Sequence, residues 1–156
     1  MKTKFFLTII SIITLFSCSN DDKVASAYDI IKYNIIGRWK LESINNSTNN
    51  ISQCVLENNY YTIYKNNNLI YEYGYNNNTA DCFYDKIDET YTVNDSTLIS
   101  KWSKGTTSFE FHNKIIEANT TELVLGLIFT KVNENGKITE TNINPVIEVV
   151  KYKKVN

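Results

Sequence analysis

The sequence predicts an all-β protein, an antiparallel up-and-down β-barrel of about eight strands. Three observations support this fold class. Short segments of alternating apolar and polar residues recur along the chain, separated by Asn, Asp and Gly residues that favour turns. Aromatic residues make up 13% of the 156 residues, with 11 Tyr, and aromatic side chains favour strands. Residues 37–44 alternate around Trp39, which we expect to lie at the centre of the core.

The first residues of the chain are typical of a targeting segment, and we exclude them from the fold. Residues 1–17 carry two Lys and then an apolar run that is too short to span a bilayer, which is typical of a signal peptide. Ser17-Cys18 resembles the lipobox of bacterial lipoproteins, so we expect a lipid anchor on Cys18. An ordinary secretory signal with an unmodified Cys18 is the alternative.

Residues 18–29 are expected to form a tether and residues 30–156 the barrel domain. The acidic stretch 19–23 resembles the surface-export tether of Bacteroidetes lipoproteins, and both surface and periplasmic display stay open. Val24, Tyr28, Ile31 and Ile35 recur at helical spacing, so a short helix, or else an extended lead-in, precedes the first strand.

Turn residues divide the remaining chain into strands. Asn66–Asn68 and the dipeptide Asn135-Gly136 are the clearest turns, and Pro145 is expected to open the last strand. The apolar run 122–132 also fits a buried helix, but Gly126 and the β-favouring neighbours indicate a strand. The expected strands are 37–44, 58–65, 69–75, 89–93, 97–102, 107–112 with a continuation past a bulge to 118, 122–132 and 146–153.

The chain has three cysteines. If Cys18 carries lipid, Cys54 and Cys82 remain, and an even remainder outside the cytoplasm predicts one disulfide. A metal site or a redox pair is the competing interpretation. The chain has one His, so the ligands for a structural metal site are too few. It has no Cys-x-x-Cys motif for a redox pair.

Gly37-Arg38-Trp39, followed by an alternating strand, resembles the Gly-x-Trp signature of lipocalins. With the lipobox and the Cys pair, residues 30–153 resemble the lipocalin-like lipoproteins of Bacteroidetes. The resemblance implies an eight-stranded calyx, an outer-membrane location and a monomer. It also implies that Trp39 packs at the closed end under a basic residue from near the C-terminus, Lys151 or Lys153. The lipocalin Thr-Asp-Tyr motif is absent.

The charge and motif content argues against nucleic-acid binding and catalysis. The net charge is −1, and five Gly form no phosphate-binding loop. His112 lies near Ser108, but no nucleophile elbow accompanies them, so we interpret His112 as an exposed turn residue. Acidic pairs such as Asp88-Glu89 are interpreted as solvated loop charges. We therefore expect no catalytic residue, cofactor or metal.

The aromatic residues are the remaining candidates for function. Five tyrosines on three consecutive expected strands are candidates to line a cavity, although the simpler interpretation is that they fill the barrel or lie on a strand face: Tyr60, Tyr64, Tyr71, Tyr73 and Tyr91. The function that follows is binding of a small hydrophobic or aromatic ligand by a lipid-anchored envelope protein. The alternative is a protein-binding module, for example an inhibitor of a secreted hydrolase, that acts through loops 45–53 and 76–81.

Overall fold

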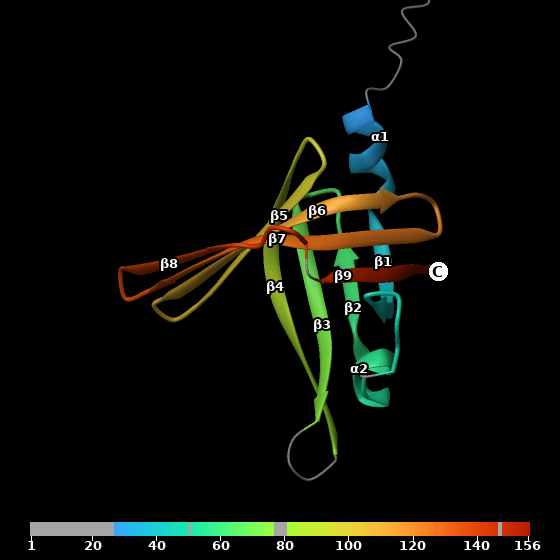
Figure 1. Cartoon of the computed structure of the whole chain (residues 1–156), viewed down its shortest axis with the longest axis horizontal. Helices are drawn as coiled ribbons and strands as arrows, with labels where there is room; N and C mark the ends of the chain where they lie inside the picture. The colour runs from blue at the N-terminus through green and yellow to red at the C-terminus, as the bar shows by residue number, and fades with distance from the viewer. Residues whose placement is uncertain (1–26, 50, 77–80, 147) are drawn as a thin grey trace, which may run out of the picture.

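The computed structural model describes residues 27–49, 51–76, 81–146 and 148–156 (Figure 1). The expected signal peptide 1–17, Cys18 and most of the tether lie outside the described residues. Within the described ranges the chain forms two short helices and nine strands, in this order: α1 Ala27–Asn34, β1 Gly37–Ile44, α2 Gln53–Asn58, β2 Tyr60–Ile63, β3 Asn68–Asn76, β4 Cys82–Asn94, β5 Thr97–Lys104, β6 Thr107–Ala118, β7 Glu122–Glu134, β8 Lys137–Asn142 and β9 Val149–Val155.

Eight of these strands close into an antiparallel barrel. The sheet order is β6-β5-β4-β3-β2-β1-β9-β7-β8, and β6 also pairs with β7, which closes the ring. Besides β6, strand β7 has two further partners, because its first half pairs with β9 and its second half with β8. Strand β8 is therefore an extra strand outside the ring. The predicted all-β barrel of about eight strands is confirmed.

The strand β1 shows the expected alternation. Trp39 and Leu41 are buried, whereas Arg38 is exposed and Lys40 is half-buried. The indole nitrogen of Trp39 donates a hydrogen bond of 2.7 Å to the carbonyl of Ile35, just after α1. Trp39 thus joins the first strand to Ile35, and because both residues are fully buried, the core fills this end of the barrel, which we call the closed end.

A basic residue does pack on Trp39, but it is Lys154 and not Lys151 or Lys153. The ammonium nitrogen of Lys154 lies 5.0 Å from the indole centroid and donates to the carbonyl of Ile36 at 3.0 Å. The register explains this correction, because Trp39 pairs with Lys154 and alternate residues of β9 face the same side. Lys151 points outward, 3.2 Å from Glu42 and 2.8 Å from Glu122.

The expected helix before the first strand is present as α1, which begins within the last residues of the expected tether. Ile35, which follows α1, is fully buried with the core, and Ile31 packs against it. The Asn34 side-chain amide donates to the carbonyl of Ala118 at 3.0 Å, so the end of α1 is also tied to β6. No helix in the described ranges is long and apolar enough to cross a bilayer.

The apolar run that begins at Glu122 is a strand, as predicted. Its neighbour β6 continues to Ala118 through register shifts after His112 and after Ile115, which confirms the predicted bulge. At the first shift, Ile128 of β7 is left without a register partner on β6. The hairpin turn at Asn135-Gly136 is also present, with β8 following it.

Several elements differ from the prediction, which gave a longer β2 and no strand at β8. Residues 53–58 form α2, capped by the Ser52 hydroxyl, which accepts from the Val55 amide at 3.3 Å. Strand β4 begins at Cys82 rather than at 89, because its exposed first half pairs with β3 in a two-stranded ribbon that alternation does not reveal. Strand β9 begins at Val149, so Pro145 lies before it rather than at its start.

Candidate ligand-binding site

A cavity of about 300 Å³ lies in the half of the barrel opposite α1. Its walls come from every strand of the ring, so no single strand defines it. Most of the lining is aromatic or aliphatic, and four residues bring carboxylate or amide groups. The lining residues are Leu41, Ile44, Asn59, Tyr61, Tyr71, Ile87, Glu89, Trp102, Phe111, Asn113, Leu127, Glu148, Val150 and Tyr152.

Three tyrosines form one wall of this cavity. The ring centroids of Tyr61 and Tyr71 are 4.8 Å apart, and those of Tyr61 and Tyr152 are 5.4 Å apart. Burial raises the pKa of all three hydroxyls, and raises it furthest for Tyr61 and Tyr152. These phenols therefore stay neutral and present aromatic faces together with weak hydroxyl dipoles.

The predicted cavity tyrosines divide between three locations. Tyr71 lines the cavity, and Tyr73 follows on the same face with its ring 5.5 Å from that of Tyr71, although it does not line the cavity itself. Tyr91 is buried in the core, where its hydroxyl donates to the Tyr64 carbonyl at 2.7 Å. Tyr60 and Tyr64 do not line the cavity, contrary to the prediction.

The register gives the reason for this correction. Tyr61 of β2 pairs with both Trp39 and Tyr71, whose side chains face the interior, so Tyr60 must face outward. The guanidinium of Arg38 lies 4.3 Å from the Tyr60 ring centroid on the outside of the barrel and pairs with Glu72. The Tyr64 side chain is exposed.

Four aromatic residues of the cavity were not among the predicted set: Tyr61, Tyr152, Trp102 and Phe111. The alternation of 97–102 carries a signal for Trp102, because it shares a face with Leu98, which is fully buried. Trp102 stacks on Phe109 with a centroid distance of 4.2 Å, and Phe111 follows on the same strand.

Glu89 is the main polar group of the cavity, and it is only 6% exposed. This overturns the interpretation of Asp88-Glu89 as solvated loop charge. Glu89 pairs in register with Leu69, a core residue, which places it at the inner end of the cavity. Burial raises the pKa of its carboxyl, and the neighbouring Ser100 hydroxyl lowers it by a smaller amount.

Asn59 is a second buried polar residue on the same lining. Its backbone carbonyl accepts from the Leu41 amide at 2.9 Å, which fixes it between α2 and β2. A hydrogen bond from its side chain lowers the pKa of the Tyr71 hydroxyl, against the larger effect of burial. The side-chain oxygen of Asn59 has no hydrogen-bond partner among the described residues.

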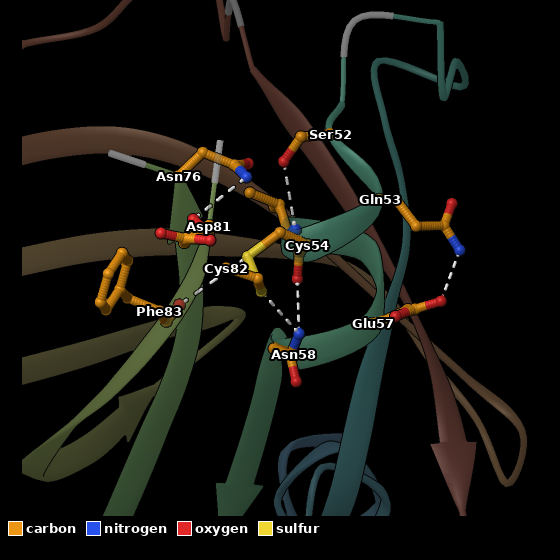
Figure 2. The surroundings of a disulfide bond; sticks show 10 residues. Ser52, Gln53, Cys54, Glu57, Asn58, Asn76, Asp81, Cys82 and Phe83 are labelled. Carbon is orange, nitrogen blue, oxygen red and sulfur yellow. Dashed lines mark hydrogen bonds between the residues drawn. A yellow bond between two sulfur atoms is a disulfide. The ribbon is translucent and has the colours of Figure 1, made fainter. Parts of the chain in front are cut away.

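A disulfide fastens α2 to the β3–β4 ribbon at the open half of the barrel (Figure 2). Cys54 in α2 is bonded to Cys82 at the start of β4, which confirms the predicted pairing. The Asn58 amide donates to the Cys54 carbonyl at 2.9 Å and approaches the Cys82 sulfur at 3.3 Å. A side chain at Gly74 would lie 2.5 Å from the Cys54 carbonyl oxygen, so only Gly allows this approach.

His112 lies away from the cavity, within the strand β6 as the predicted strand 107–112 requires, but it is half-buried and not an exposed turn residue. Its Nε2 atom is 2.6 Å from the Glu110 carboxylate, and its ring packs at 4.6 Å against Phe129. Hydrogen bonds from His112 and Lys101 lower the pKa of Glu110. Within the described ranges no three His, Cys, Asp or Glu side chains gather in a way that could hold a metal ion.

Comparison of the chain with protein-family models, with curated proteins and with solved structures finds no match. The geometry of the cavity is therefore the basis for a functional conclusion. An interior lined by aromatic rings, with a few polar groups, suits the binding of a small molecule.

Proposed function

We propose that this protein is a lipid-anchored, lipocalin-like envelope protein that binds a small hydrophobic or aromatic molecule in its barrel without transforming it. The observation that supports this most is the cavity of about 300 Å³ between the rings of Tyr61, Tyr71 and Trp102. Ligand pockets usually measure about 300–1,000 Å³, so this one suits a ligand of one or two rings.

The positions of α1 and the cavity fit an anchor at Cys18. Helix α1, which is the first described element, precedes β1 (Figure 1), and Ile35 directly after it accepts the hydrogen bond of the Trp39 indole at the closed end. A tether that reached the membrane from there would leave the opposite, ligand-binding end unobstructed. The Cys54–Cys82 disulfide fits an oxidising compartment outside the cytoplasm.

A binding experiment on the purified full chain tests the proposal. We expect native mass spectrometry to detect a co-purifying small molecule, and 1-naphthol added as a neutral probe to quench Trp102 fluorescence. In Leu127→Trp the larger side chain should fill the cavity and abolish binding of the probe. The matched control is Ile138→Trp, because Ile138 is an exposed residue of β8 outside the ring.

Two results would contradict the proposal. One is a protein that neither carries nor takes up a small molecule. The other is equal binding by the Leu127→Trp and Ile138→Trp variants, because that would place the probe outside the cavity. The alternative function, protein binding through loops 45–53 and 76–81, stays a prediction, and it would survive a cavity that binds nothing.

A further inference from the structure

The polar atoms left unpaired around the cavity are acceptors that lack a donor. Oε2 of Glu89 and the side-chain oxygen of Asn59 are buried and have no partner of good hydrogen-bond geometry in the part of the chain that the structure describes. The hydroxyl of Ser100 lies beside Glu89 and, as a donor, lowers the pKa of its carboxyl by less than burial raises it. An unpaired buried acceptor is unfavourable, and a ligand that brings donors would relieve it.

The charged residues that line the cavity are acidic. Glu89 lies at its inner end and Glu148 is an exposed residue of the lining. Among the described lining residues, none is Lys, Arg or His. An anionic ligand would meet two carboxylates without a counter-charge, whereas a cation would be attracted by both.

The aromatic walls favour a cation as well. The rings of Tyr61, Tyr71 and Tyr152 pack together along one wall, and Trp102 and Phe111 lie on strands across the ring. The face of an aromatic ring attracts an ammonium group, most strongly where water is excluded. A carboxylate at the inner end with aromatic rings around it is a chemical environment suited to an organic ammonium ion.

We propose that the cavity binds a small organic amine in its ammonium form, with the ammonium group paired to Glu89 and an aromatic or aliphatic body packed among the tyrosines and Trp102. This inference rests on the proposed function, because it names the chemical class of the ligand for the same cavity. Asn59 accepts a further donor of the ligand. The small volume restricts the ligand to an amine with a single ring or a short chain.

Isothermal titration of the purified full chain with three matched probes tests this inference. The probes are phenethylammonium, the neutral 2-phenylethanol and the anionic phenylacetate, each measured against the same buffer and detergent. We expect phenethylammonium to bind about tenfold or more tightly than 2-phenylethanol, because it adds a charge-assisted hydrogen bond to Glu89. Phenylacetate should bind most weakly.

Glu89→Gln is the variant that tests the role of the carboxylate, because it keeps the shape of the side chain and removes its charge. We expect it to remove the preference for phenethylammonium while 2-phenylethanol binds as before. Glu140→Gln is the matched control, since Glu140 pairs with Lys131 outside the ring. It should leave all three affinities unchanged, and circular dichroism confirms that each variant is folded.

The outcomes separate this inference from the proposed function. If phenethylammonium and 2-phenylethanol bind equally, and Leu127→Trp abolishes both, the cavity binds ligands but the ammonium assignment is overturned. If Glu89→Gln keeps the full preference for the ammonium probe, the assignment to Glu89 is overturned. If none of the three probes binds, the ammonium inference is overturned, and the proposed function fails with it only if no small molecule co-purifies and 1-naphthol does not bind either.

Discussion

Lys154 lies over the indole ring of Trp39, with its ammonium nitrogen 5.0 Å from the ring centroid and 3.0 Å from the carbonyl oxygen of Ile36. The two residues pair in register across β1 and β9, near opposite ends of the described sequence. This contact therefore joins the first and last strands of the ring at its closed end. It also connects both strands to the segment that follows α1.

Replacing Lys154 tests how much this contact stabilises the barrel. We expect Lys154→Met to lower the free energy of unfolding by about 1–3 kcal/mol, because it removes a cation–π contact and a hydrogen bond to a carbonyl. Urea denaturation followed by tryptophan fluorescence measures the change. Lys151→Met is the control, since Lys151 makes ion pairs on the outer surface, and its effect should be clearly smaller. Equal effects would contradict the role given to Lys154.

Gly37 makes room for Lys154, and its substitution should reveal a coupling between the two positions. Its φ of +143° is unfavourable for other residues, and a Cβ atom there would lie 2.7 Å from Cε of Lys154. We expect Gly37→Ala to destabilise the protein by more than about 1 kcal/mol. In the Lys154→Ala background the steric part of this loss should disappear, so a double-mutant cycle should give a non-additive result. Strict additivity would show that Lys154 does not limit residue 37.

The disulfide should contribute strongly to stability because it closes a long loop. Cys54 and Cys82 are 28 residues apart. The chain-entropy model then gives about 3–4 kcal/mol for the bond. We expect the Cys54→Ser/Cys82→Ser double variant to lose that much in urea denaturation. Reducing the wild-type protein with dithiothreitol should reproduce the loss, whereas the double variant should not respond to the reductant. A response of the variant would point to another disulfide.

Glu89 should make stability depend on pH. Its pKa is raised in the folded protein, so the folded state binds the proton more tightly than the unfolded state. The contribution is fully present below the ordinary pKa of a Glu side chain and is lost as pH rises through the folded pKa. Glu89→Gln lacks this titration. We expect the difference in unfolding free energy to move in favour of Glu89→Gln as pH rises from about 4 towards neutral.

Denaturation of both proteins across this pH range checks the prediction. The Glu110 carboxyl, whose pKa is lowered, gives the opposite trend, but it is common to both proteins and cancels in the difference. The hydroxyls of Tyr61, Tyr71 and Tyr152 near Glu89 stay neutral over this range, because their pKa values are raised. A difference that does not change with pH would show that Glu89 is solvated.

Much of the fold followed from local patterns in the chain. Alternation around Trp39 placed it in the core, and Asn135-Gly136 marked a hairpin. The even number of cysteines that remain if Cys18 carries lipid, together with the expected signal peptide, predicted the disulfide. Each of these features depends on residues close in sequence or on simple counting, so no knowledge of strand register was needed.

The site was harder to predict, because strands with similar residues on both faces give no sign of which face is interior. Residues 60–63 carry Tyr60 on one face and Tyr61 on the other, and the last strand carries Lys151 and Lys153 opposite Lys154. In both strands the residue that faces inward is the register partner of Trp39. Local sequence does not contain that register.

The chain by itself determined an antiparallel barrel with an indole at its closed end and one disulfide. Only the tertiary structure decided which side chains form the cavity, and it moved Glu89 from an expected solvated loop to the inner end of that cavity. The physical reason is that burial of a polar side chain depends on neighbours that are distant in sequence. Glu89 is buried because β3 and β5 bring Leu69 and Ser100 against it.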